Sequence, residues 1–379
     1  MRTHLPTALL LTLACLLTGG AAAGHAADDD RARWHTGVFS RVPPPGFPAH
    51  VYAHPNGRVY AGTYTDPTGD TTRSRVFEWS RDGTLLRSWT VPGQHLDEPH
   101  GVQVATSDGQ GRLVLLEKST SRVLLLDPRT GELRRYARLP DLPTCSSADP
   151  GTPGTPGTRC SPNLLDKPAV PNFAAWGPDG SLYVTDYGQA VLWRIPPGSP
   201  RPRVWLADRR LDGVEFGTTG LLLEPGHRSL LVAQGSSGGL GEPNPTSGRL
   251  YRVPIRRDGL PGDLRLLWES RPGDLPDGFG IARSGNIYVA AAGLSQQIVV
   301  LGPDGEEVER FPQVPAAGDN GSSIPFDTPS SATFLGRSIL VANQAYTGNR
   351  DHHAVLDVHV GEPGAPVFVP DDAGDRVSR

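Results

Sequence analysis

The sequence predicts an all-β fold, a six-bladed β-propeller whose four-stranded antiparallel blades surround a central channel. Three observations predict it. A strand-and-turn unit recurs about six times between Pro48 and Asn343. Glycine and proline are abundant, with 46 and 38 of the 379 residues, and no long stretch shows helical spacing of apolar residues. Repeats of this length built from short strands and tight turns are typical of propellers.

The repeat is clearest at Pro171–Asp186, which reads PNFAAWGPDGSLYVTD, and at Pro276–Ala290, which reads PDGFGIARSGNIYVA. Both copies have the same spacing from proline to the turn glycine. Asn-Gly and Asp-Gly pairs accept the positive φ angles of tight hairpins. The predicted turns are Asn56-Gly57, Asp108-Gly109, Asp179-Gly180, Pro225-Gly226 and Ser284-Gly285.

Second strands follow these turns and are apolar on both faces, as expected for sheets packed between neighbouring sheets. They cover residues 58–62, 112–116, 181–184, 229–233, 286–290 and 338–342. Third and fourth strands follow in most units, for example at 123–126 with 133–139 and at 298–301 with 306–311. Four strands per unit make a propeller blade.

The units begin near residues 49, 100, 172, 219, 277 and 330, which are 51, 72, 47, 58 and 53 residues apart. The long interval contains a Pro/Gly/Thr-rich stretch, residues 141–167, which we interpret as an inserted loop. Six blades account for one domain, residues 28–379. Either the early strand at 34–42 or the tail at 354–369 completes the ring, and the sequence leaves this choice open.

The first 27 residues have the pattern of a secretory signal peptide, with an early Arg2, an apolar run from Ala8 to Leu17, and small residues up to Ala27. The run is too short for a membrane span. We therefore expect a secreted protein without a transmembrane segment. The alternative of a lipid anchor at Cys15 is disfavoured because apolar residues continue beyond it.

Two further cysteines, Cys145 and Cys160, bracket the inserted loop. Exported chains oxidise, so we expect these two to form a disulfide. The formal net charge of −4 is mild and predicts no nucleic-acid partner. A monomer that binds a small molecule is the simplest expectation.

In a propeller the first strands line the channel, and the residues at their starts converge on one mouth. This predicted ring consists of Ala49 or His50, His100, Asn172, Thr219, Asp277 and Ser330. Polar groups that face a closed channel find few protein partners, so they tend to hold water, a metal or a ligand. An oxygen-rich set with one carboxylate suits a hard cation such as calcium.

The two repeats quoted above, with Trp176-Gly177-Pro178-Asp179-Gly180 in one and Asn286-Ile287-Tyr288-Val289 in the other, resemble the SMP-30/gluconolactonase/LRE-like family, which is related to NHL-type and strictosidine-synthase-like propellers. The resemblance covers residues 46–343. It implies a lactone hydrolase that holds one divalent cation on the axis. The family's ligands are a first-blade Glu, Asn residues of middle blades and an Asp in Pro-Asp-Gly.

Carried over to this chain, the resemblance makes Asp277 and Asn172 metal ligands. It departs from the family where Ala49 replaces the Glu and Thr219 replaces the second Asn. Calcium is the first expectation; His50 and His100 would favour zinc or manganese. Asp277 or His100 would act as catalytic base, and His50 and Thr219 would contact the substrate.

Two functions follow from these residues. The first is a metal-dependent hydrolase of a lactone or related ester, in which the cation polarises the carbonyl. The second is a secreted propeller that binds a small molecule or a cell-envelope partner without catalysis, which the loss of the first-blade Glu favours. A strictosidine-synthase-like condensing enzyme would need a channel Glu that no ring position supplies. The absence of a Gly-x-Ser-x-Gly elbow argues against an α/β serine hydrolase.

Overall fold

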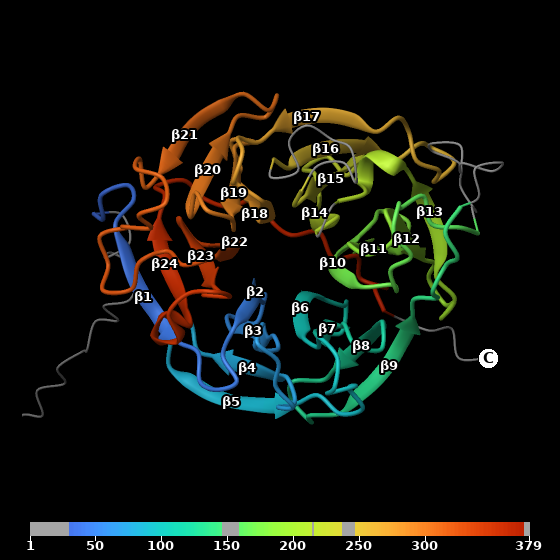
Figure 1. Ribbon diagram of the computed structural model, residues 1–379, viewed down its shortest axis with the longest axis horizontal. Coiled ribbons are helices and arrows are strands. Elements are labelled where there is room, and N and C mark those ends of the chain that lie inside the picture. Colours follow the sequence, from blue (N-terminus) through green and yellow to red (C-terminus); the bar gives the residue numbers. More distant parts are fainter. Residues whose placement is uncertain (1–29, 146–158, 214–215, 237–246, 375–379) are drawn as a thin grey trace, which may run out of the picture. The chain divides into compact units, whose positions relative to one another are not determined.

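Six four-stranded antiparallel sheets surround a central channel in the computed structural model, as predicted (Figure 1). The structure describes residues 30–145, 159–213, 216–236 and 247–374. The predicted signal peptide lies outside the described residues, as does the middle of the inserted loop. The sheets belong to one compact unit that begins at Ala32.

Each blade is a hairpin-connected sheet whose first strand is nearest the channel. Blade 1 consists of β2 (Pro48–Ala53), β3 (Val59–Thr63), β4 (Arg75–Trp79) and β5 (Leu85–Thr90). Blade 2 consists of β6 (Val102–Ser107), β7 (Leu113–Glu117), β8 (Arg122–Leu126) and β9 (Leu133–Arg138). Blade 3 consists of β10 (Pro171–Trp176), β11 (Leu182–Asp186), β12 (Val191–Ile195) and β13 (Arg203–Ala207). Blade 4 consists of β14 (Thr218–Leu223), β15 (Ser229–Gln234), β16 (Arg249–Pro254) and β17 (Arg265–Glu269). Blade 5 consists of β18 (Pro276–Ile281), β19 (Ile287–Ala291), β20 (Gln297–Leu301) and β21 (Glu307–Phe311). Two short 3₁₀ helices are η1 (Arg209–Leu211) and η2 (Arg350–His352).

The sixth blade closes the ring with both ends of the chain. Its strands are β22 (Pro329–Leu335), β23 (Ser338–Asn343), β24 (Ala354–His359) and β1 (Thr36–Arg41). The sheet order is β1-β24-β23-β22, so the early strand is outermost and the tail strand is third. Both of the segments that the sequence left as alternatives therefore take part in closure, which ties the blade together through antiparallel pairing of β1 with β24.

Apolar packing between neighbouring blades forms the core. Six buried clusters correspond to the six blade-to-blade contacts, and the second strands are buried on both faces. Buried polar groups link the blades as well: the Trp176 indole nitrogen donates to the Ser107 carbonyl oxygen at 2.8 Å, from blade 3 to blade 2. Burial on both faces explains why these strands lack the alternation of half-exposed sheets.

The strand register defines two ends of the channel. We call the end where the first strands begin the upper mouth, and the end with their hairpin turns the lower mouth. The first residue of each first strand pairs with the last residue of the second strand: Pro48 with Thr63, Val102 with Glu117, Pro171 with Asp186, Thr218 with Gln234, Pro276 with Ala291, and Pro329 with Asn343. The residues that come next in these strands form one ring around the upper half of the channel.

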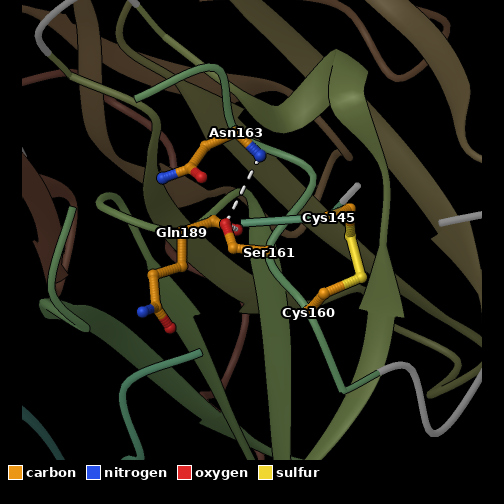
Figure 2. Close-up of a disulfide and its surroundings, with 5 residues drawn as sticks. All are labelled: Cys145, Cys160, Ser161, Asn163 and Gln189. Atoms are coloured by element: carbon orange, nitrogen blue, oxygen red, sulfur yellow. Dashed lines mark hydrogen bonds between the residues drawn. A yellow bond between two sulfur atoms is a disulfide. The ribbon is translucent and has the colours of Figure 1, made fainter. Parts of the chain in front are cut away.

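The predicted disulfide is confirmed: Cys145 and Cys160 are joined across a separation of 15 residues. Figure 2 shows Ser161, Asn163 and Gln189 beside the disulfide. The Ser161 hydroxyl donates to the Gln189 carbonyl oxygen at 2.7 Å, and the Asn163 side-chain amide donates to the Gly188 carbonyl oxygen at 2.6 Å. The disulfide thus fixes a segment that supports the turn after β11.

Candidate functional site at the upper mouth

The ring at the upper mouth differs from the predicted one in blade 2. Because Val102 pairs with Glu117, the residue in register with Asn172 and Asp277 is Gln103, and His100 precedes the strand. The observed ring is Ala49, Gln103, Asn172, Thr219, Asp277 and Ser330. The sequence register was wrong in this blade because β6 begins only at Val102, so the predicted position, His100, lies three residues before Gln103 and precedes the strand.

Three side-chain oxygens of this ring lack hydrogen-bond partners among the described residues. They are Oε1 of Gln103, Oδ1 of Asn172 and Oδ1 of Asp277, and all three atoms are inaccessible. Buried polar atoms are normally satisfied by protein, water or ligand. These oxygens from blades 2, 3 and 5 are therefore candidate acceptors for an enclosed water molecule or ligand.

A lysine that was not anticipated from the sequence faces this ring. Lys118 follows β7 in blade 2, and its ammonium nitrogen is buried without a hydrogen-bond partner among the described residues. Its nitrogen lies 4.4 Å from the centre of the Tyr64 ring and 4.8 Å from that of Tyr187. The two tyrosines follow β3 and β11, so the amine is held between aromatic rings from both neighbouring blades.

Lys118 and Asp277 shift each other's protonation. Burial lowers the pKa of the Lys118 amine to about 7, and the nearby Asp277 and Asp186 charges oppose that shift. Burial likewise raises the pKa of the Asp277 carboxyl to about 7, opposed by Lys118. Both groups change charge near neutral pH, as acid–base groups of active sites do.

Tyrosines enclose this pair. Burial raises the pKa of Tyr187 to about 12, with further increases from the charges of Tyr346, Asp186 and Asp277. Tyr187 also lies 6.4 Å from Phe216 between ring centroids. The aromatic side chains form a rim of low polarity above the polar ring, which strengthens electrostatic interactions inside it.

Asp186, by contrast, is a structural acid of this region. It accepts hydrogen bonds from the Val170, Gly188 and Gln189 backbone amides and from the Trp193 indole nitrogen. These bonds hold the turn that carries Tyr187.

His100 is placed differently from the expected catalytic base. Its Nε2 lies 2.7 Å from the Thr72 carbonyl oxygen and its Nδ1 lies 2.9 Å from the Glu98 carbonyl oxygen. Both ring nitrogens thus face carbonyl oxygens of the local backbone, so neither nitrogen is directed at the polar ring. His100 therefore holds two loops together at the mouth and is not brought into the ring.

His50 and Thr219, predicted to contact substrate, lie on the channel wall. Thr219 donates through its hydroxyl to the Pro276 carbonyl oxygen at 3.1 Å, which links blades 4 and 5. The ring of His50 meets that of Phe173 edge-on at 4.7 Å between centroids, one residue below the polar ring. The Nδ1 of His50 has no partner among the described residues, and burial lowers the pKa of this imidazole to about 3. It is neutral at physiological pH.

The polar ring does not fit the dication that the family resemblance implied. Asp277 is the only carboxylate in the ring, and the Lys118 ammonium lies close enough to it to shift its pKa. The Lys118 ammonium offsets the charge of Asp277, and both carboxylate oxygens of the nearby Asp186 already accept N–H donors, so the ring offers no second free carboxylate to hold a dication. The described residues also contain no cluster of three His, Cys, Asp or Glu side chains placed to bind a metal. The amide oxygens of Gln103 and Asn172 are thus better matched to hydroxyl or ammonium donors.

Comparisons by sequence found no matching protein-family model and no matching curated protein. Solved structures do match. A protein described as a gluconolactonase is 18% identical with a TM-score of 0.54, covering 87% of this chain and 93% of that one. The calcium-binding protein regucalcin of Agrobacterium tumefaciens is 15% identical with a TM-score of 0.56, covering 88% and 98%.

A third neighbour, an inactive variant of virginiamycin B lyase from Staphylococcus aureus in complex with quinupristin, is 14% identical with a TM-score of 0.51, covering 84% and 82%. These likenesses confirm the expected resemblance at the level of the fold, which is that of gluconolactonase- and regucalcin-type propellers. Lyases share it to a similar degree, so the reaction must be argued from this chain's own residues. Among the described residues no helix has the length and hydropathy of a membrane span.

Proposed function

We propose that the upper mouth binds a small carbonyl compound and that the protein hydrolyses a lactone or related ester there. The observation that supports this most is that Asp277 and Lys118 lie near enough for each charge to affect the pKa of the other, which is about 7 for both, while the Tyr64 and Tyr187 rings enclose the amine. A base and a cationic donor that act near neutral pH are the two groups that ester hydrolysis needs.

In this mechanism Asp277 in its carboxylate form accepts a proton from a water molecule whose oxygen attacks the carbonyl carbon. The Lys118 ammonium donates a hydrogen bond to the carbonyl oxygen as negative charge develops on it. The carbon–oxygen bond to the leaving alcohol then breaks, and the proton held by Asp277 passes to that alkoxide. The products are a carboxylic acid and an alcohol, joined in one molecule when the substrate is a lactone.

Unlike the family mechanism, no step passes through a metal ion, because the ring's charges oppose one. The unpartnered oxygens of Gln103 and Asn172 would accept hydrogen bonds from substrate hydroxyls. These hydrogen bonds would select substrates that carry hydroxyl groups, and they would take no part in bond breaking.

The test is a panel of aliphatic and sugar lactones followed by proton release, with chelator present throughout. We expect Asp277→Asn to lower kcat about 10²- to 10⁴-fold, and Lys118→Met to lower it as well. Asp258→Asn, which removes an exposed turn carboxylate, is the matched control and should leave kcat unchanged. Full activity in Asp277→Asn would reject the mechanism.

The second candidate is a binding protein without catalysis, and the replacement of the family's first-blade Glu by Ala49 favours it. In that case a lactone or hydroxy acid would bind stoichiometrically in calorimetry, without turnover, and binding would be lost in Lys118→Met. Secretion also stays a proposal. An intact mass of exported protein that lacks residues 1–27 would support it.

A further inference from the structure

A second cavity occupies the lower half of the channel, on the other side of the polar ring. It has a volume of about 470 Å³ and is lined mainly by apolar residues of all six blades. Small side chains make room for it, among them Ala105, Ala175 and Ala332. Ligand pockets in proteins are typically of this size and are mostly apolar with a few placed polar groups.

Phe173 and His50 separate this cavity from the site above. A Cβ added to Gly278, in blade 5, would meet the Phe173 ring tip at 2.8 Å, so the ring of a blade 3 residue reaches blade 5. His50 packs on Phe173 from blade 1 and lines the cavity. The unpartnered Nδ1 of His50, in a residue only 8% exposed, supplies a polar group at the inner end of an otherwise apolar chamber.

The C-terminal tail forms the opposite wall. The Arg283 amide donates to the Pro363 carbonyl oxygen at 2.9 Å, and the Ala365 amide donates to the Ile281 carbonyl oxygen at 2.8 Å. Further along, the Phe368 ring contacts the His227 ring of blade 4 in a tilted arrangement, with 4.1 Å between ring centroids. The tail is thus fixed across the lower mouth and contributes Pro363 to Phe368 to the lining.

The charges of this cavity have one sign. Arg81 and Arg283, both exposed residues of hairpin turns, belong to the lining, and no Asp or Glu does. Arg81 forms no ion pair with a described carboxylate, while the Arg283 Nε donates to the Gly364 carbonyl oxygen at 3.3 Å. The nearby His54 is satisfied at both ring nitrogens, by the Gly111 carbonyl oxygen and the Asn56 amide. The positive charge at the lower mouth therefore attracts an anion, whereas the apolar interior of the lower cavity favours an apolar group.

From this arrangement we propose that the lower cavity is a second ligand site, which binds a small amphipathic carboxylate such as a medium-chain aliphatic acid. The apolar chain occupies the chamber, and the carboxylate faces Arg81 and Arg283. The site is independent of the proposed hydrolysis because the Phe173 and His50 side chains lie between the two.

The probes are hexanoate, octanoate and decanoate, measured by titration calorimetry on the full mature chain, with 1-octanol as the neutral probe. Affinity should increase about three- to fourfold per added methylene until the chamber is filled. The variant Arg81→Gln/Arg283→Gln should weaken octanoate binding at least tenfold and 1-octanol binding less than twofold. Arg256→Gln, at another hairpin turn outside the lining, should change neither.

Larger side chains at Ala105, which lines the lower cavity, test whether octanoate binds in that cavity. Ala105 is partly exposed to the channel, so Ala105→Leu should weaken octanoate and octanol alike, with Ala105→Val as the milder substitution if the larger side chain disturbs folding. Lys118→Met should leave octanoate binding unchanged. The proposal is overturned if the folded wild-type protein binds no octanoate at millimolar concentration. It is also overturned if octanoate binding survives both Ala105 variants, or if Lys118→Met abolishes it. Loss of lactonase activity in the Asp277 variants bears only on the upper site.

Discussion

The buried ammonium nitrogen of Lys118 lies 4.4 Å from the centre of the Tyr64 ring, which reaches it from the neighbouring blade. Tyr187 takes the same position on the other side at 4.8 Å. Cation–π contacts of this kind stabilise a desolvated cation by about 2 kcal/mol or more, whereas desolvation of an ammonium costs several kcal/mol. The charged form of Lys118 is therefore destabilised by its burial, and buried charged groups of this kind are typical of functional sites.

Replacing both buried charges should stabilise the fold. We expect Lys118→Met/Asp277→Asn to raise the free energy of unfolding at pH 7 by about 1–3 kcal/mol, because neither side chain then desolvates a charge, whereas Lys118→Met alone would leave the Asp277 carboxylate uncompensated. Urea unfolding of the variant and wild type measures it. A decrease in stability would show that the ammonium has a stronger partner than Asp277.

The pH dependence of unfolding should carry the signature of the same pair. Since the folded-state pKa of Lys118 is lowered from 10.5 to about 7, the unfolded chain binds more protons between these values, and stability should rise with pH across that window. Lys118→Met should remove the rise. Since the pKa of Asp277 is raised from 3.8 to about 7, stability should fall as pH increases from about 4 to 7. Asp277→Asn should flatten that fall, and urea titrations at each pH test both.

Calcium should bind only after the ring's charges are changed. The wild-type melting temperature should not respond to millimolar calcium, because one carboxylate faces one ammonium. The double variant Ala49→Glu/Lys118→Met places a second carboxylate in the ring and removes the ammonium, so calcium should raise its melting temperature. Magnesium and the single variants serve as controls. A calcium-dependent rise in the melting temperature of the wild type would contradict the conclusion that the ring does not fit a dication.

The disulfide should stabilise the turn that carries Tyr187. Opening a loop of 15 residues costs about 3 kcal/mol in the chain-entropy model. We expect Cys145→Ser/Cys160→Ser to lose roughly that amount in urea unfolding. Amide exchange at Gly188 and Gln189 should also become faster, because the Ser161 and Asn163 contacts to that turn loosen. Unchanged amide exchange at Gly188 and Gln189 would show that the disulfide does not stabilise the turn that carries Tyr187.

Gly278 should tolerate no side chain. A Cβ there would meet Ser331 Cβ at 2.7 Å and the Phe173 ring at 2.8 Å. We expect Gly278→Ala to destabilise the protein by about 1–3 kcal/mol through overpacking. Gly37, in strand β1, has nothing within 4 Å of the same position, so Gly37→Ala is the control and should have little effect. Equal melting temperatures for the two variants would mean that Phe173 does not cross the channel.

Much of the fold could be predicted because its signals are local. The turn glycine of the Asp179-Gly180 hairpin has a φ of 73°, which its residue type permits. The alternation between such turns and short apolar runs recurs often enough to count blades. The disulfide was also predictable, since its two cysteines flank one loop in a chain whose first residues have the pattern of a signal peptide.

The site was predicted only in part. Asp277 and Asn172 were found because the repeat places both at the same point of their strands. His100 was misplaced because the prediction began blade 2 at His100, whereas β6 begins at Val102 and its ring residue is Gln103, three positions later.

The strand periodicity, the blade count and four of the ring's polar residues (Asn172, Thr219, Asp277 and Ser330) could be predicted, because they depend on neighbours along the chain. The three-dimensional fold alone places β1 in blade 6, because this closure pairs residues more than 300 positions apart. It also decided the role of Lys118. Nothing in the local sequence marks a lysine after a strand as buried, since its burial and its lowered pKa arise from Tyr64, Tyr187 and Asp277, which three other blades bring to the channel.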